Sequence, residues 1–224
     1  MDNVQSFLNT NEVFRSLGET QKEFFRKEAI SRSYTKGAFI TQYGDTWPYL
    51  FVITKGKINA IKESSEGRSL IVTTFKSEDI FWGLAFFWED VPMPVALEAT
   101  EATNVLLWSR ERILPIIFQN GEFSWALSRL MVKRMQRASE IVDGLAFQPL
   151  TGRVARLLLD QFPTNQNVVP RNLTLDEMAS RVGTTREMVC RILYRFAEQG
   201  AIRINRTEFI FTDRNVLEEH IQSN

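Results

Sequence analysis

The chain has 224 residues, of which 44% are hydrophobic, and its 27 basic and 27 acidic residues give a formal net charge of zero. This length and composition predict one large or two medium globular domains, without the global basic field that marks many nucleic-acid-binding proteins. The N-terminus lacks the basic-then-apolar layout of a signal peptide, and no apolar run reaches the roughly 18 residues of a membrane span. We therefore expect a cytoplasmic protein with no membrane partner.

The chain contains one cysteine, Cys190, and one histidine, His220. A single cysteine excludes an intramolecular disulfide, and the two residues together cannot make a usual structural zinc site or iron–sulfur cluster. We expect no metal and no cofactor.

Residues 35–109 read as a series of short strands. Runs of β-branched and aromatic residues are interrupted by glycines, which we expect to serve turns that need positive φ. The runs are residues 38–40, 49–53, 57–61, 70–75, 96–99 and 104–108, and the glycines are Gly37, Gly44, Gly56, Gly67 and Gly83. This pattern predicts an antiparallel β-barrel or sandwich. A metal-dependent enzyme on such a barrel would need histidines there, and His220 lies outside it, so we expect no enzyme.

A long amphipathic helix is predicted from about Glu122 to Phe147. One face of this helix carries mainly apolar residues at alternating spacings of three and four, which is the 3.5-residue period of a two-stranded coiled coil. We call this face the seam. The seam consists of Ser128, Met131, Met135, Ala138, Val142 and Leu145. We expect the helix to pair with its copy in a homodimer; the alternative is a helix packed on its own barrel.

Proline forbids simple helix continuation at Gln148-Pro149-Leu150, so a joint between domains is expected there. The predicted fold is α+β with three parts. Residues 1–120 form a β-barrel domain with flanking helices, residues 121–148 form the dimerisation helix, and residues 149–224 form a winged helix-turn-helix.

Two helix starts ten residues apart indicate the helix-turn-helix. Residues 174–177 (TLDE) and 184–187 (TTRE) each fit a capping box, in which a hydroxyl and a glutamate satisfy backbone donors at a helix start. Gly183 lies between them, where the first helix must end. The turn is therefore predicted to be short and sharp.

The apolar spacing predicts which face of each helix is buried. The buried stripes are Leu175, Met178, Ala179 and Val182 in the first helix and Met188, Val189, Ile192, Leu193 and Phe196 in the second. The second helix then exposes a polar ridge, made of Thr185, Arg186, Glu187, Cys190, Arg191 and Tyr194. Such a ridge suits the major groove of double-stranded DNA; the alternative is an ordinary solvated helix face.

Three residues of this ridge carry base-reading chemistry. A guanidinium can bond guanine O6 and N7 together, and a carboxylate can accept a hydrogen bond from the cytosine amino group, which makes Arg186, Glu187 and Arg191 candidates for reading G·C pairs. A twofold axis along the long helix would set two such helices one DNA turn apart, to match a pseudo-palindromic operator.

The sequence after the second helix predicts a wing. Gly200 ends the helix, and residues 202–204 and 208–211 read as a hairpin across residues 205–207. Between Arg181 and Arg206 the sequence has six arginines (181, 186, 191, 195, 203 and 206) and only two acidic residues, Glu187 and Glu198. This local basic patch, which includes Arg206 in the wing, suits phosphate contacts.

Over residues 14–211 the chain resembles the cyclic-AMP receptor protein and fumarate-nitrate reductase regulator superfamily of transcription regulators. The resemblance is carried by the spacing of Gly37, Gly44 and Gly56 and by three blocks: 136–147 (QRASEIVDGLAF), 151–155 (TGRVA) and 183–193 (GTTREMVCRIL). It implies a cyclic-nucleotide-binding-like barrel and a homodimer that contacts DNA and RNA polymerase. It also implies that Arg186, Glu187 and Arg191 read bases, and that Thr174 and Thr185 lie near phosphates.

The effector site departs from this family. Members that bind cyclic AMP carry a Gly-Glu pair and an arginine for the cyclic phosphate, and here Leu84 follows Gly83 and Pro94 aligns with the arginine. A cyclic nucleotide would lose its acceptor and countercharge, so we expect no response to cyclic AMP. The residues implied for this pocket are Phe81, Trp82, Gly83, Leu84, Pro94, Val95 and Ser139.

The aromatic segment 81–88 leaves three alternatives open: core filling, a pocket for an unidentified hydrophobic small molecule, or no effector at all. Haem or iron–sulfur sensing would need ligands that this segment lacks. Cys190 likewise has two interpretations, a small residue beside DNA or a thiol made oxidisable by nearby arginines.

Two functions remain from the sequence. The leading one is a sequence-specific, dimeric transcription regulator. The alternative is a ligand-sensing module that acts through protein partners, with a helix-turn-helix that has lost DNA binding.

Overall fold

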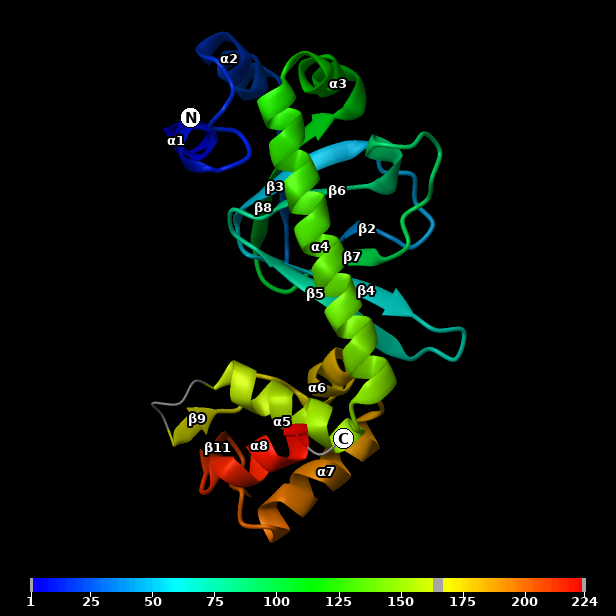
Figure 1. Ribbon diagram of the computed structural model, residues 1–224, viewed down its shortest axis with the longest axis vertical. Helices are drawn as coiled ribbons and strands as arrows, with labels where there is room; N and C mark the ends of the chain where they lie inside the picture. Colours follow the sequence, from blue (N-terminus) through cyan, green and yellow to red (C-terminus); the bar gives the residue numbers. More distant parts are fainter. Residues whose placement is uncertain (1, 163–166, 223–224) are drawn as a thin grey trace. The chain divides into compact units, whose positions relative to one another are not determined.

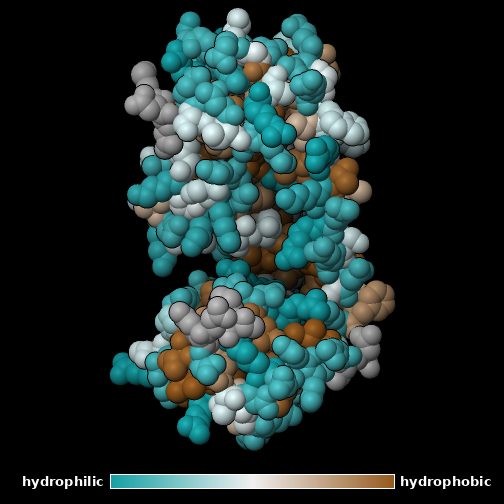
Figure 2. Space-filling model, turned by 60° about the vertical axis from the view of Figure 1, so that its left-hand side comes forward, coloured by the Kyte–Doolittle hydropathy of each residue, from teal (hydrophilic) through white to brown (hydrophobic). Residues whose placement is uncertain are grey.

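The computed structural model describes residues 2–162 and 167–222. The chain divides into two compact units, each considered separately. The sheet unit comprises Met1–Lys62 and Val72–Arg137, and the helical unit comprises Glu63–Ile71 and Ala138–Asn224. The long helix α4 (Gly121–Phe147) contributes to both. Most residues on the face drawn in Figure 2 are hydrophilic, with hydrophobic side chains exposed between them.

Among its described residues, the sheet unit contains eight strands and three further helices. Figure 1 labels most of them. The strands are β1 (Ile30–Tyr34), β2 (Phe39–Thr41), β3 (Tyr49–Lys55), β4 (Lys57–Glu63), β5 (Ser69–Lys76), β6 (Ile80–Trp82), β7 (Ala96–Ala99) and β8 (Thr103–Ser109). The helices are α1 (Asp2–Thr10), α2 (Glu19–Glu28) and α3 (Arg110–Gln119), with a 3₁₀ turn at Leu84–Phe86.

These strands form two antiparallel four-stranded sheets, ordered β1-β8-β3-β6 and β2-β7-β4-β5. The predicted β-rich domain is confirmed, although its strands do not form a closed barrel. Strands β1 and β6 were not predicted; both are short and lie at the edges of one sheet.

The two central strands of the first sheet, β3 and β8, are buried on both faces, which explains their continuous apolar runs. Along β3, Leu50 and Val52 pack in one core cluster with Phe25 of α2, Phe123 of α4 and Phe14 of the turn between α1 and α2. The alternate residues of β3 pack in the core cluster between the sheets; they are Phe51 and Ile53. Because side chains alternate across a strand, one apolar run supplies two cores.

The predicted role of Gly83 is wrong. Its φ is −74°, whereas Gly37, Gly44, Gly56 and Gly67 do have positive φ, as predicted. A Cβ on Gly83 would lie only 1.8 Å from the carbonyl oxygen of Trp47. Glycine is required at this position because two backbone segments meet there.

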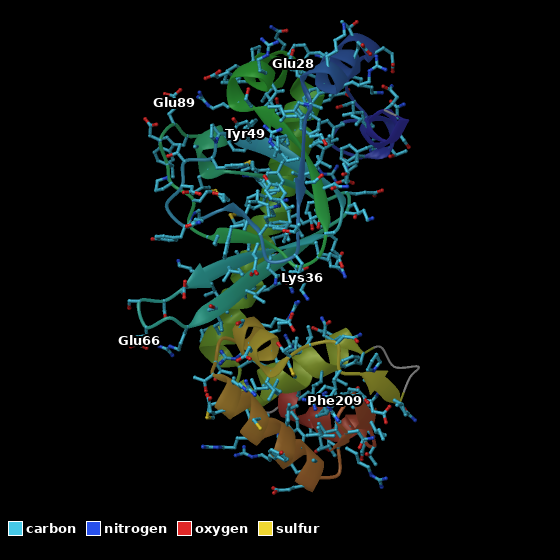
Figure 3. All side chains as sticks on the ribbon, turned by 180° about the vertical axis from the view of Figure 1, so that it is seen from behind. Glu28, Lys36, Tyr49, Glu66, Glu89 and Phe209 are labelled. Atoms are coloured by element: carbon cyan, nitrogen blue, oxygen red, sulfur yellow. The ribbon has the colours of Figure 1, made fainter. Side chains whose placement is uncertain are left out.

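In the described part of the helical unit, a small sheet and four helices that follow α4 surround one core. The elements are α5 (Leu150–Gln161), β9 (Val168–Pro170), α6 (Leu175–Val182), α7 (Arg186–Glu198), β10 (Ile202–Ile204), β11 (Glu208–Phe211) and α8 (Arg214–Gln222). The sheet order is β10-β11-β9. Phe209, labelled in Figure 3, belongs to this core together with Phe196. Strand β9 and helix α8 were not predicted from the sequence.

The break between α4 and α5 lies where the sequence predicts it. Helix α4 ends at Phe147, and Pro149 is the N-cap of α5. The Arg153 side chain donates a hydrogen bond to the Leu145 carbonyl oxygen (3.2 Å), so α5 satisfies one of the free carbonyls at the end of α4. A hinge motion at this joint remains a prediction.

Candidate nucleic-acid interface

Helix α6 begins at the predicted capping box. The Thr174 hydroxyl accepts a hydrogen bond from the Glu177 backbone N–H (3.1 Å), and the Glu177 carboxylate accepts one from the Thr174 backbone N–H (2.7 Å). Both donors would otherwise be free at the helix start. The box is confirmed, and it fixes where the first helix of the pair begins.

The turn after α6 is as short as predicted. Gly183 has φ 69° and ψ 49°, the left-handed conformation of a helix end, and its N–H donates to the Ala179 carbonyl oxygen. The Thr184 N–H donates to the same carbonyl oxygen (3.0 Å). Thr184 is therefore part of the turn.

The predicted second capping box is wrong by one residue. The N-cap of α7 is Thr185, whose hydroxyl accepts a hydrogen bond from the Met188 N–H (3.4 Å). Because Thr184 is part of the turn, the third residue of the helix is Met188. Its side chain has no oxygen to accept a hydrogen bond from the Thr185 backbone N–H, so the box is incomplete. Glu187 is left to face outward.

The predicted ridge on α7 is exposed while the opposite face is buried. Arg186, Glu187, Arg191 and Tyr194 are exposed, with Tyr194 at 63%, and Cys190 is half-buried. On the other face, the side chains of Val189, Ile192, Leu193 and Phe196 are at most 2% exposed. The packed face fixes which residues the helix presents to a partner.

The ridge carries charges of both signs. Arg186 Nη1 lies 3.5 Å from a carboxylate oxygen of Asp176, in the first turn of α6, and both side chains are largely exposed. The pKa of Glu187 is lowered, first by hydrogen bonding to its own backbone N–H and then by the Thr185 hydroxyl. Glu187 is therefore a carboxylate at neutral pH, able to accept hydrogen bonds.

The wing forms as predicted. Strands β10 and β11 pair with Ile202 opposite Phe211 and Ile204 opposite Phe209, and Arg206 is exposed in the connecting loop. A residue that the sequence analysis missed supports this loop: Arg171 donates from its side chain to the Asn205 carbonyl oxygen (3.1 Å) and from its backbone to Thr207 (2.9 Å). The apolar run at Val168 and Val169 was the available signal for the third strand.

Five of the six arginines in the local basic patch are exposed; they are 186, 191, 195, 203 and 206. Arg181 differs, since it is half-buried and burial lowers its pKa, an effect opposed by Glu177. The outward basic patch is thus smaller than the sequence suggests.

The predicted seam of α4 is exposed along its whole length. Ser128, Met131, Met135, Ala138, Val142 and Leu145 are all exposed, and Met135 and Val142 reach 67% and 61%. Two further exposed hydrophobic residues, Trp125 and Val132, precede Ser139 at a seven-residue spacing and were missed. Trp125 extends the apolar stripe toward the start of the helix and Val132 widens it, so α4 leaves an unpaired hydrophobic face.

The residues implied for an effector pocket have different environments. Trp82 and Gly83 are buried and Phe81 and Val95 are half-buried, while Leu84, Pro94 and Ser139 are exposed. A cavity of about 330 Å³ in the sheet unit is lined by other residues, among them Tyr49 and Glu89, which Figure 3 labels, and Arg110. The predicted pocket remains a prediction.

Within the aromatic segment, part of the core-filling interpretation holds. Phe86 is fully buried, and Phe81 packs its ring 5.1 Å from that of Phe51 and 4.5 Å from that of Phe75. Leu84, Phe87 and Trp88 are exposed by 39–76%.

Arg134, a cation of α4 that was not predicted as a site residue, lies against these aromatic residues. Its guanidinium carbon is 5.1 Å from the ring centre of Phe75, 5.3 Å from that of Phe81 and 4.3 Å from that of Trp82. Burial lowers the pKa of Arg134 to about 10, partly offset by the negative charge of Asp79. Arg134 therefore stays cationic at neutral pH.

Within residues 2–162 and 167–222, His, Cys, Asp and Glu side chains form no group of three or more that could hold a metal ion. In the same described part of the chain, no helix has the length and apolar character to cross a membrane.

Comparisons with known proteins agree with this architecture. A family model of the cyclic nucleotide-binding domain matches residues 31–120, and one of the Crp-like helix-turn-helix domain matches residues 152–220. The chain is 31% identical over 192 residues to the cAMP-activated global transcriptional regulator Vfr of Pseudomonas aeruginosa, covering 82% of this chain and 90% of that protein.

A second relative is the CRP-like cAMP-activated global transcriptional regulator of Mycobacterium tuberculosis, 29% identical over 209 residues, with 90% of this chain and 92% of the relative covered. Among solved structures, a CRP/FNR-family transcriptional regulator from Eubacterium rectale matches with a TM-score of 0.78 at 22% identity, over 94% of this chain and 98% of that chain. The chain therefore belongs to the cyclic-AMP receptor protein and fumarate-nitrate reductase regulator (CRP/FNR) family of DNA-binding transcription regulators.

Proposed function

We propose that this protein is a homodimeric regulator that reads G·C pairs of a pseudo-palindromic operator with α7. The observation that carries the proposal is the exposed ridge of Arg186, Glu187 and Arg191, held outward by a fully packed opposite face. Arginine pairs with guanine in the major groove and a carboxylate accepts from cytosine, so these residue types favour G·C pairs. Cys190 and Tyr194 complete the same ridge.

Phosphate contacts would position the ridge. Thr174 and Thr185 lie at the starts of α6 and α7, where helix dipoles favour an anion. Arg206 adds a cation in the loop of the wing, where it can meet the DNA backbone. These contacts would supply affinity, while the three ridge residues would supply sequence preference.

Dimerisation is proposed through the exposed stripe of α4. Hydrophobic residues at a coiled-coil period, such as Met135 and Val142, are costly to leave in water and are buried when two copies pair. In this arrangement residues 1–120, 121–148 and 149–224 would act as sensor-type, dimerisation and DNA-binding parts. Contact with RNA polymerase stays a prediction of the resemblance.

We further propose that cyclic AMP does not control this regulator, although several relatives are named as cAMP-activated. Leu84 and Pro94 supply neither an acceptor for a ribose hydroxyl nor a countercharge for a phosphate. Burying an unpaired phosphate would cost several kcal/mol.

Selection of bound DNA from a random pool tests the proposal. We expect the purified protein to enrich a G·C-containing inverted repeat with half-sites about one helical turn apart, and to bind it with equal affinity with and without cyclic AMP. An enriched site that binds only with cyclic AMP would contradict the proposed independence. Failure to enrich any sequence would instead favour a protein-interaction module with a helix-turn-helix that no longer binds DNA.

The ion pair of Arg186 with Asp176 predicts a substitution that strengthens DNA binding. Asp176→Asn removes a carboxylate that both competes for Arg186 and repels phosphates, so operator affinity should rise by up to about fivefold, the scale of one exposed ion pair. Binding measured at two salt concentrations checks this. Asp160→Asn, which removes the same charge from α5, is the control and should leave the affinity nearly unchanged.

A further inference from the structure

The two sheets of the sheet unit leave an edge strand each near Arg134. Strand β6 ends one sheet and β5 ends the other. The Ile53 N–H donates to the Asp79 carbonyl oxygen, and the Gly83 N–H donates to that of Tyr49, so odd-numbered residues of β6 bond to β3. By the alternation of an antiparallel pair, the Ile80 carbonyl points away from the sheet. Such a group needs a donor from outside the sheet.

Arg134 supplies that donor. Its Nη2 donates a hydrogen bond to the Ile80 carbonyl oxygen, and its guanidinium carbon lies within 5.3 Å of three ring centres. Phe75 comes from β5, whereas Phe81 and Trp82 come from β6, so the rings belong to edge strands of different sheets. One guanidinium thereby joins both edges to α4.

The three rings are held in place by their own packing. Phe75 and Phe81 pack with ring centres 4.5 Å apart, and Phe81 and Trp82 stack with ring planes 15° apart at 6.4 Å. Asp79 adds a nearby negative charge, and its carboxylate is fixed by the Lys76 backbone N–H (2.7 Å). Aromatic faces, a carbonyl oxygen and a carboxylate together favour a cation over any neutral or anionic group.

We propose that Phe75, Phe81 and Trp82 form a cation-binding site for a planar guanidinium, and that the chain fills this site with its own Arg134. The filled site fastens α4 to both sheet edges without a small molecule. Two of these residues, Phe81 and Trp82, are among those implied for an effector pocket, so Arg134 occupies surroundings that an effector would need. This inference rests on the proposed function: DNA binding requires no external ligand, because Arg134 already fills the site.

Arginine suits the site better than lysine. The planar guanidinium can stack on a ring while its N–H groups remain free to donate in the plane, and it is more weakly hydrated than an ammonium. Loss of the Arg134 side chain should leave the cation-binding site of three aromatic rings empty and the Ile80 carbonyl oxygen without its donor.

The test asks whether methylguanidinium, which mimics the end of an arginine side chain, restores the thermal stability of the full-length Arg134→Ala variant. The variant should unfold roughly 4–8 °C below the wild type, and millimolar methylguanidinium should restore at least half of that loss in a saturable manner. Arg134→Met fills the space with an apolar chain and should show no such rescue. Arg129→Ala, an exposed arginine of the same helix, should neither lose stability nor respond. No saturable rescue of Arg134→Ala, or equal rescue of all variants, would overturn the proposal.

A double-mutant cycle keeps the proposal testable if Arg134→Ala does not fold. Trp82→Leu keeps an apolar side chain but removes the ring with the shortest distance to the guanidinium. If the ring binds the cation, Trp82→Leu combined with Arg134→Met should destabilise the protein by clearly less than the sum of the single changes. Simple additivity would contradict cation binding at this ring.

Operator binding separates this inference from the proposed function. Arg134→Ala should bind the selected operator more weakly than the wild type, and methylguanidinium should restore that affinity. If the wild type selects no DNA, the proposed function fails while thermal rescue can still show a cation site. If the wild type binds its operator but thermal rescue is absent, the cation site fails on its own.

Discussion

Replacement of both Arg186 and Arg191 by alanine is expected to reduce affinity for the selected operator by about 100-fold or more, while binding to unrelated DNA falls far less. Each bidentate contact with guanine discriminates bases by about 1–3 kcal/mol, and every tenfold change in affinity corresponds to about 1.4 kcal/mol. Both side chains are exposed on α7, so their removal should leave the helix packed. The double substitution should therefore mainly lower the ratio of operator affinity to affinity for unrelated DNA.

Fluorescence anisotropy with the operator and a scrambled duplex, at matched salt, measures this difference. Arg15→Ala combined with Lys55→Ala removes the same two positive charges from exposed positions of the sheet unit and serves as the control. Circular dichroism would establish that α7 still forms. Equal losses on operator and scrambled DNA would contradict base reading and reduce the role of these arginines to phosphate attraction.

Met135→Glu is expected to dissociate the proposed dimer into monomers at micromolar concentration. Met135 lies near the middle of α4 and is 67% exposed in the single chain, so its substitution should not disturb the chain's own core. In a parallel pair the two carboxylates would face each other at the axis, desolvated and of like charge. One uncompensated buried charge costs about 3 kcal/mol or more, enough to weaken association by over 100-fold.

Sedimentation equilibrium measures this change directly. Lys133→Gln lowers the charge of the same helix by the same amount from a position about 200° around the axis, and it should leave the dimer intact. Operator binding should fall together with dimerisation, because a monomer engages one half-site. A dimer that survives both Met135→Glu and Val142→Glu would place the interface elsewhere and favour a helix that does not pair with its copy.

The helix-turn-helix was predictable because its determinants are local. Thr174 and Glu177 are three residues apart, and Gly183 needs only its own φ to end the helix. The one-residue error at the start of α7 has an equally local cause. Thr184 and Thr185 offer the same hydroxyl, and the sequence does not show that the turn uses the N–H of Thr184.

The surroundings of Arg134 were not predictable in this way. The site requires Arg134 to meet two strand edges, and its hydrogen-bond partner Ile80 lies 54 residues earlier in the chain, in a strand of only three residues. On a helix wheel, an arginine beside the seam is indistinguishable from a solvated one. Gly83 presents the same difficulty, because its neighbour Trp47 lies 36 residues away and only the fold brings their backbones together.

The position of β8 in the first sheet has a consequence for synthesis of the chain. β8 is the last strand of the sheet unit in the sequence, yet it lies between β1 and β3, and Ile30 pairs with Leu107. During translation from the N-terminus, β1 has no partner in its sheet until residue 109 has left the ribosome. The sheet unit must therefore close by long-range contacts after most of it has been made, a slow step compared with the local contacts of helices. A nascent chain halted before β8 would expose the unpaired backbone edges of β1 and β3, and chaperones that bind unpaired strands should recognise it during that interval.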